Sequence, residues 1–237
     1  MDPNSVSSCV IRKRNCFCLS HTGFNSQHPC IMSAGAQTVD EGTCFNFHGD
    51  SYLQFTPNNF NNNNSIHYSM KFRTAQENEI ILYTQGPHGD DEALFIKNGK
   101  LRYHLFNTSP SGVEGSFGAY LEADENVATG SWITVHVFRS WPQYDSNMRR
   151  TRRKTGLEVD IDGQTYIYVD YFERDGISIH PVIYLGGYRN TLGTTLNNFT
   201  GQIKDIFEEK NRHRFENPSL NYGSRVGLDC VGTVAPN

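Results

Sequence analysis

The sequence predicts an all-β protein, built as a two-sheet antiparallel β-sandwich. Its 12 Tyr and 15 Phe suit the pleated, half-buried surface of a strand, and its 21 Gly suit the turns between strands. From about residue 45 onward, short runs alternate apolar and polar side chains, which indicates strands with one face on a core. About ten such runs over roughly 190 residues close most naturally as two packed sheets.

The clearest alternation is Ile66, Tyr68, Met70 and Phe72 with polar residues between them. Asn98-Gly99 and Asp162-Gly163 each separate two alternating runs and predict tight hairpins, because both central positions of such a turn need positive φ. The charged segment 207–215 is expected to turn. In order, the expected strands are 51–55, 65–73, 79–84, 92–97, 100–105, 132–138, 157–162, 164–171, 182–185 and 201–207.

Charge and hydropathy exclude two classes of partner. The chain has 21 Lys+Arg against 25 Asp+Glu, a formal net charge of −4, so it lacks the basic excess of a nucleic-acid-binding protein. No apolar run approaches the roughly 18 residues of a membrane span. The first residues lack a basic stretch followed by an apolar one, so they form no signal peptide, and an extracellular chain would here be a fragment.

Four of the six cysteines fall within the first 30 residues, at 9, 16, 18 and 30. Such clustering indicates disulfides in an oxidising compartment or a metal site in a reducing one. The sequons at Asn63, Asn107 and Asn198 favour the first interpretation and an extracellular location. The alternative is a zinc site made from Cys16, Cys18, His21, His28 and Cys30.

Seven local motifs carry a family resemblance across about 45–230. Phe72-Arg-Thr74 with Ile80-Ile-Leu-Tyr83 is one, and Trp132 with Val135, Val137 and Arg139 is another. The remaining motifs are 47–55, 92–101, 157–160, 184–187 and 199–203. In this order they resemble the laminin G-like domain of laminins, agrin, neurexins, contactin-associated proteins, Crumbs and Slit.

The resemblance implies a concanavalin A-like jelly roll over 41–237. It also implies an extracellular, non-enzymatic module of adhesion or matrix proteins, secreted or part of a receptor ectodomain. Its partner would be a protein ligand or a heparan sulfate-type glycan. The alternative to a binding module is a domain with a purely structural role, as a spacer in a long ectodomain.

Residues 1–40 form a cysteine-rich leader. Cys9, Cys16-Phe-Cys18 and the segment from Thr22 to Cys30 resemble the second half of an epidermal-growth-factor-like module, which implies a Cys18–Cys30 bridge. The first two cysteines of that module are absent.

A second disulfide follows from a departure within the domain. The family usually has a cysteine where Gln202 stands, paired with one near the domain end. Cys230 occupies that second position. We expect it to pair with Cys44, because the first and last strands of such a sandwich lie side by side.

Many members of the family bind one Ca²⁺ at an edge of the sandwich through hard oxygen ligands. The corresponding positions here are Asp90, Asn107, Gly176 and Ser178. Serine substitutes poorly for a carboxylate, and the alternative is that Asp90 and Asp91 are ordinary loop acids. No other cofactor is expected.

An inserted hairpin loop between Trp141 and Leu157 contains Arg149, Arg150, Arg152, Arg153 and Lys154. Guanidinium groups match the geometry of sulfates, so the tract predicts a glycan-binding site. A solvated loop and a furin-type cleavage site at 150–153 are the alternatives.

Glu158, Asp160 and Asp162 are the one hint of an enzyme. Alternation would place all three carboxylates on one strand face, as in jelly-roll glycoside hydrolases. The family's own strand explains the same residues without chemistry, so we expect no enzyme.

Overall fold

The computed structural model describes residues 9–12, 15–18, 43–62, 65–86, 89–106, 120–170, 179–188 and 197–230. The chain divides into two compact units, Met1–Val39 and Asp40–Asn237. In the first unit, β1 (Cys9–Arg12) pairs antiparallel with β2 (Asn15–Cys18). His21, His28 and Cys30 lie outside the described residues, so the zinc and Cys18–Cys30 hypotheses stay predictions.

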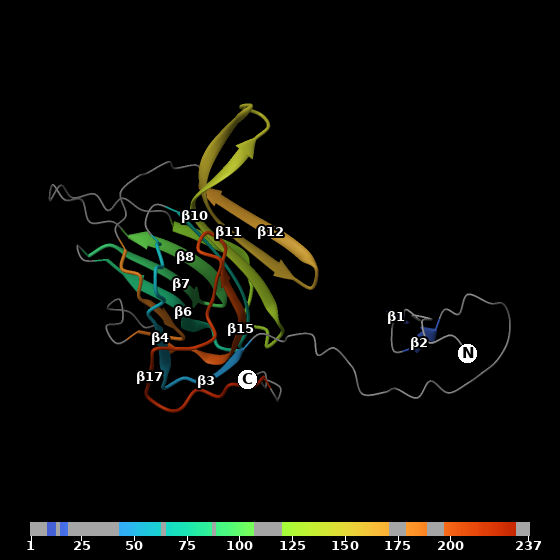
Figure 1. Cartoon of the computed structure of the whole chain (residues 1–237), viewed down its shortest axis with the longest axis vertical. Coiled ribbons are helices and arrows are strands. Elements are labelled where there is room, and N and C mark those ends of the chain that lie inside the picture. Colours follow the sequence, from blue (N-terminus) through green and yellow to red (C-terminus); the bar gives the residue numbers. More distant parts are fainter. Residues whose placement is uncertain are drawn as a thin grey trace, which may run out of the picture. The chain divides into compact units, whose positions relative to one another are not determined.

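Two packed sheets make up the second unit, as the sequence predicted (Figure 1). The first sheet has the order β12-β11-β10-β5-β15-β16, with β3 paired to β15. Its strands are β3 (Cys44–His48), β5 (Ile66–Arg73), β10 (Ile133–Asp145), β11 (Arg150–Ile161), β12 (Gln164–Asp170), β15 (Thr200–Glu208) and β16 (His213–Arg214).

The second sheet has the order β17-β4-β13-β6-β7-β8-β9, with β14 paired to β6. Its strands are β4 (Tyr52–Phe55), β6 (Asn78–Gln85), β7 (Asp91–Lys97), β8 (Lys100–Phe106), β9 (Tyr120–Asn126), β13 (Ile183–Leu185), β14 (Asn197–Asn198) and β17 (Leu220–Tyr222). The two-residue β14 runs parallel to β6, and the other described pairs are antiparallel.

Apolar side chains from both sheets fill the space between them. Ile66, Tyr68, Met70 and Phe72 of β5 are each at most 1% exposed, while the residues between them are half-buried. Burying each large apolar side chain contributes about 1.5–3 kcal/mol relative to leaving it in water. The alternation in the sequence therefore matches the buried face of this central strand.

Both predicted tight turns are present. Asn98 and Gly99 join β7 to β8 with φ of 53° and 74°, and Asp162 and Gly163 join β11 to β12 with φ of 53° and 82°. These positive values are the ones that the dipeptides predicted.

Strands β9, β14 and β17 of the second sheet were not predicted from the sequence, and β9 is the longest of them. β9 is largely polar, and Ala123 is its fully buried side chain, flanked by half-buried or exposed residues. β9 lies at the edge of its sheet, where charged side chains discourage pairing with other chains. An edge strand of this kind lacks the apolar alternation that identifies an inner strand.

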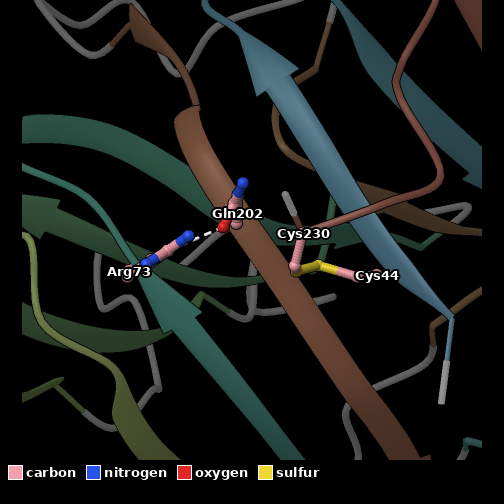
Figure 2. The surroundings of a disulfide bond; sticks show 4 residues. All are labelled: Cys44, Arg73, Gln202 and Cys230. Carbon is pink, nitrogen blue, oxygen red and sulfur yellow. Dashed lines mark hydrogen bonds between the residues drawn. A yellow bond between two sulfur atoms is a disulfide. The ribbon is translucent and has the colours of Figure 1, made fainter. Parts of the chain in front are cut away.

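The expected Cys44–Cys230 disulfide joins β3 to the C-terminal segment, with 5.6 Å between the Cα atoms (Figure 2). Asn46 and Gly227 exchange backbone hydrogen bonds of 2.9 and 3.1 Å beside it. Gln202, at the family's usual cysteine position, is buried on the adjacent β15 and accepts a hydrogen bond of 2.6 Å from Arg73 Nε. Gln202 thus makes a polar contact with β5, and Cys230 pairs with Cys44 of β3 instead.

Candidate functional site

Several connections meet at one end of the sandwich, which we call the rim. There Arg139 of β10 pairs with Ile66 at the start of β5, so the loop before β5 lies beside the end of this ladder. Glu209 N, just after β15, donates to His67 O at 3.0 Å. His180 N, before β13, donates to Gln85 O at the end of β6, also at 3.0 Å.

A buried polar network lies beneath the rim and joins the two sheets. Arg139 and Glu92 are 3.5 Å apart and at most 1% exposed, and the Tyr103 hydroxyl donates to Glu92. Arg139 Nη2 also donates to Asn62 O, and Asn62 Nδ2 donates to His180 O at 2.7 Å. These hydrogen bonds hold the backbone of the loop before β5 and of the segment before β13.

Beyond the rim, residues 141–154 form a two-stranded extension of β10 and β11, which we call the basic hairpin (Figure 1). The cations were expected in an inserted hairpin loop, and a hairpin is present here. Its ladder continues through pairs such as Trp141 with Lys154 and Tyr144 with Thr151, so most of the cations lie on a strand. Asp145 Oδ1 closes the turn by accepting from Asn147 N at 3.0 Å and Met148 N at 3.1 Å.

A β-bulge separates the basic hairpin from the sandwich. The register shifts between Phe138 and Trp141, and Ser140 adopts a φ of 48°. Arg153 Nη1 donates to Ser140 O at 3.2 Å, so one cation of the tract holds the bulge. Bulges bend a strand and increase its twist, which re-aims the hairpin relative to the sheet.

Gly156 is needed just below this bulge. A Cβ atom there would lie 2.1 Å from Phe138 Cζ, so the glycine lets the buried ring cross the neighbouring strand.

The five predicted cations lie on this one element but differ in surroundings. Arg149 is in the turn with a φ of 52°, and Arg149 and Arg150 are exposed. Arg150, Arg152 and Lys154 share one strand face, with Arg153 on the other. Arg152 Nη1 lies 3.5 Å from Asp145 Oδ2. The hydrogen bond from Met148 N is the main reason that the pKa of Asp145 is lowered.

Two large apolar side chains accompany the cations at the tip of the hairpin. Tyr144 is 67% exposed and Met148 is 54% exposed.

An acidic segment begins β7 at the rim. Asp90, Asp91 and Glu92 are 3%, 8% and 0% exposed. Burial, followed by repulsion from Asp90 and Glu92, raises the pKa of Asp91 to about 6. Of the predicted calcium ligands, Asp90 is described, whereas Asn107, Gly176 and Ser178 lie outside the described residues. The described residues contain no group of three or more His, Cys, Asp or Glu side chains arranged to hold a metal ion.

The three carboxylates suspected of hydrolytic chemistry do not share a strand face. Glu158 and Asp160 lie on β11, but β11 ends at Ile161 and Asp162 enters the turn with a φ of 53°. That prediction was wrong because the left-handed turn takes Asp162 out of the pleat. Asp160 accepts hydrogen bonds from Gly163 N at 3.1 Å and Thr165 Oγ1 at 3.3 Å, and so caps the turn.

One of the three predicted glycosylation sites lies within the described residues. Asn198 of β14 is half-buried, and its amide lies against Gly187, whereas Asn63 and Asn107 fall outside the described residues. The furin-type segment 150–153 is paired with Pro142–Asp145, so a protease would have to open the hairpin to reach it.

Residues 72–210, more than half of the chain, match the sequence profile of the Laminin G domain. The chain belongs to the laminin G domain family. Its solved relatives include domains LG4-5 of the mouse laminin α1 chain, with 18% identity and a TM-score of 0.59 over 79% of this chain and 47% of that one. The LG1-3 region of the laminin α2 chain gives 18% identity and a TM-score of 0.60 over 79% and 35%.

Two curated relatives are named Protein eyes shut homolog. The Pongo abelii protein is 32% identical and the Homo sapiens protein 31% identical over 80 residues. The match spans 32% of this laminin G chain and 2% of each relative. Laminin G domains are typically extracellular binding modules and generally not enzymes. Among the described residues, no helix has the length and apolarity needed to cross a bilayer.

One cation of the rim was not predicted from the sequence. Lys210 lies in the turn between β15 and β16, and burial is the main reason that its pKa is lowered. The segment was expected to turn, but the sequence carried no signal that this turn lies against His67 at the start of β5.

Proposed function

We propose that this laminin G domain binds sulfated glycans of the heparan sulfate type outside the cell, through the basic hairpin. The observation that carries the proposal is the position of the tract on a paired hairpin beyond the rim, instead of in a loop along the sandwich. The hairpin holds five cations and one carboxylate, whereas the whole chain has a formal net charge of −4. An acidic body with one cationic projection directs a polyanion to that projection.

The chemistry of the side chains favours sulfate. A guanidinium group donates paired hydrogen bonds to a planar or tetrahedral oxyanion, which an ammonium cannot reproduce. Arg149 and Arg150 are exposed, so their N–H groups can contact a ligand without a change in the fold. The hairpin ladder limits the backbone entropy lost on binding, because both strands are already ordered.

Heparin affinity tests the proposal. The variant Arg149→Gln/Arg150→Gln should raise the Kd for a heparin oligosaccharide on the order of tenfold or more, since charge-assisted hydrogen bonds are worth about 1.5–3 kcal/mol each. Lys97→Gln/Lys100→Gln removes two charges at the β7–β8 turn and is the matched control. Equal elution from heparin by all three proteins would rule out the hairpin as the site.

Calcium assistance is a second proposal at the rim, and Asp90 is its anchor. It is supported by three consecutive buried acids at the start of β7. The Arg139 guanidinium lies within 4 Å of the last of them, Glu92. A hard cation would offset this buried negative charge. Calorimetry should show Ca²⁺ binding that Asp90→Asn abolishes, and an absence of heat at millimolar Ca²⁺ would refute the proposal.

A protein ligand is the alternative occupant of the hairpin, because Tyr144 and Met148 are exposed beside the arginines. Aromatic residues and arginines are typical anchors of protein interfaces. Tyr144→Ser/Met148→Ser discriminates between the two: it should leave heparin affinity within about twofold if the charges alone hold the ligand. Loss of heparin binding in this variant would show that the apolar tip is part of the glycan site.

A further inference from the structure

The second sheet has a small hydrophobic cluster of its own on its outer face. Leu82 of β6 belongs to the main core between the sheets, whereas Tyr83, the next residue, belongs to a separate buried cluster. Because side chains alternate along a strand, this second cluster lies on the side of the sheet that faces away from the core. Tyr184 of β13 and Tyr188 pack against it and are half-buried.

Five tyrosines form a continuous row across this face, which we call the tyrosine row. Tyr222 of the edge strand β17 stacks on Tyr52 of β4, with ring centroids 4.7 Å apart. Tyr188 stacks on Tyr83 at 4.3 Å, and Tyr184 links the two stacks at 4.6 Å from Tyr188 and 6.2 Å from Tyr52. Tyr52 and Tyr83 are 9% and 3% exposed, whereas the other three rings keep part of their surface open to solvent.

Two glutamine side chains hold the outer rings in place. The Tyr222 hydroxyl donates to Gln54 Oε1 at 3.1 Å, and the Tyr188 hydroxyl donates to Gln85 Oε1 at 2.9 Å. Rings that are already ordered lose little conformational entropy when a ligand binds. Gln85 is exposed, so its Nε2 group can donate a hydrogen bond to a ligand.

Asp91 of β7 supplies an acceptor next to this donor. It is the Cα partner of Gln85, so the two side chains lie on the same face of the sheet. Asp91 is 8% exposed, and its Oδ1 atom is buried with no hydrogen-bond partner among the described residues. A buried acceptor without a donor costs free energy, which a ligand hydroxyl group would offset.

The aromatic rings and these polar groups together fit a saccharide. A β-linked hexopyranose has a flat face of C–H groups that packs on an aromatic ring, and hydroxyl groups at its edge that both donate and accept hydrogen bonds. The three outer rings expose on the order of 200 Å² together, because a whole aromatic side chain presents about 150–250 Å². A stable protein interface needs about 800 Å² from each partner, so the tyrosine row matches a smaller ligand.

Charge on this face favours an uncharged chain. Arg102 is the cation that β8 adds opposite Phe95, and its guanidinium lies 2.7 Å from the Glu122 carboxylate. A sulfated chain would be repelled by the Asp91 carboxylate, whereas the hydroxyl groups of a neutral chain would donate to it.

We propose that the tyrosine row binds a neutral oligosaccharide of β-linked hexopyranoses. Its sugar rings stack on the outer tyrosines, and its hydroxyl groups form hydrogen bonds with Gln85 and Asp91. The basic hairpin extends β10 and β11 of the first sheet, whereas the tyrosine row lies on the second. This site therefore goes beyond the proposed binding of sulfated glycans and does not depend on it.

Calorimetric titration of the full chain with hexasaccharides of β-linked glucose, galactose or N-acetylglucosamine tests the proposal. At least one should bind, with a Kd on the order of 0.1–1 mM. Tyr188→Leu keeps an apolar cover over Tyr83 but removes the aromatic face, so the Kd should rise about fivefold to tenfold. Gln85→Leu, at an exposed position, should weaken binding severalfold. Tyr144→Leu removes an exposed tyrosine of the basic hairpin and should leave the Kd unchanged.

The outcomes separate this site from the basic hairpin. Arg149→Gln/Arg150→Gln should weaken heparin binding and leave the affinity for the neutral hexasaccharide unchanged, and loss of both would overturn the second site. No heat with any of the three hexasaccharides at about 10 mM would refute the proposal. A dimer in sedimentation experiments that Tyr222→Ala dissociates, without saccharide binding, would assign the face to a second copy of the chain and also overturn it.

Discussion

At the scale of single residues, Glu79 is the buried carboxylate with the clearest consequence for stability. It is 1% exposed, near the start of β6, and accepts hydrogen bonds from Thr74 Oγ1 at 2.8 Å and Thr200 N at 2.7 Å. Burial raises its pKa to about 7, and the hydrogen bonds from Thr74 and Thr200 limit the shift. The folded protein therefore retains a proton on Glu79 at pH values where the unfolded chain has released it.

This difference predicts that stability falls as the pH rises. Between about pH 4.5 and 7 the unfolded state binds fewer protons than the folded state, so the free energy of unfolding decreases, by about 3 kcal/mol for this group at full ionisation. Glu79→Gln should flatten much of the dependence and make the protein more stable than the wild type at pH 8. Urea unfolding at pH 5 and pH 8 measures this, and equal pH dependence in both proteins would contradict it.

Two ion pairs differ in burial and should differ in how much the loss of one partner lowers the free energy of unfolding. Glu92 and Arg139 are 3.5 Å apart in the core, whereas Lys71 and Asp205 are 3.1 Å apart with side chains 43% and 33% exposed. Removing one partner of a buried pair leaves an uncompensated charge, which costs roughly 3–5 kcal/mol, while exposed pairs contribute about 0–1 kcal/mol.

Arg139→Met should therefore lower the free energy of unfolding by about 3–5 kcal/mol, and Lys71→Met by less than about 1 kcal/mol. Urea titrations followed by tryptophan fluorescence measure both. The double variant Glu92→Leu/Arg139→Met should recover much of the loss, since it removes both charges from the core. Equal destabilisation by the two single variants would show that burial does not decide the outcome.

At the scale of elements, the alternation of side chains predicted most of the long strands, and charge concealed the edge strand β9. β5 could be identified because one face is apolar and the other polar, but β9 could not, because Ala123 is its one fully buried residue. The basic hairpin was expected as an inserted hairpin loop, but the extent of its paired strands could not be predicted, because its tract of like charges resembles solvated sequence. Its pairing depends on the register of Phe138 with Gly156 in the adjoining sheet. No local sequence pattern indicates that register.

The link between β3 and the C-terminal segment gives a prediction at this scale. The Cys44–Cys230 bridge spans 186 residues, and closing such a loop stabilises the folded state by about 5 kcal/mol in the chain-entropy model. Cys44→Ala/Cys230→Ala should lower the free energy of unfolding by roughly that amount. In urea titrations, a reductant should destabilise the wild-type sandwich and leave the sandwich of the variant unchanged, because the leader forms a separate unit.

For the whole molecule, the sandwich could be predicted and the site only in part. Core strands repeat the alternation of apolar and polar side chains, so the fold class could be predicted from it. The family could be predicted from the order of the motifs. The site depends on which connections meet at the rim, and that is a property of the topology. Arg153 was identified from its tract, but Lys210 lies in a separate turn, whose position is set by the pairing of β15 with β5.

The same topology implies that the sandwich and the basic hairpin are separable. The core lies between the sheets, and the hairpin extends past the bulge at Ser140. Replacing residues 141–154 by Asn-Gly should leave a cooperative unfolding transition with a midpoint within about 4 °C of the wild type, since little apolar surface is lost. The change removes five cations and one carboxylate, which takes the formal net charge from −4 to −8.

Retention on heparin should then disappear even at low salt, because the remaining acidic surface repels a polyanion. Calorimetry and heparin chromatography on the same preparation measure stability and binding together. A variant that has lost both its transition and its binding would show that the hairpin is part of the folding core. A stable variant that still binds heparin would place the glycan site elsewhere on the sandwich.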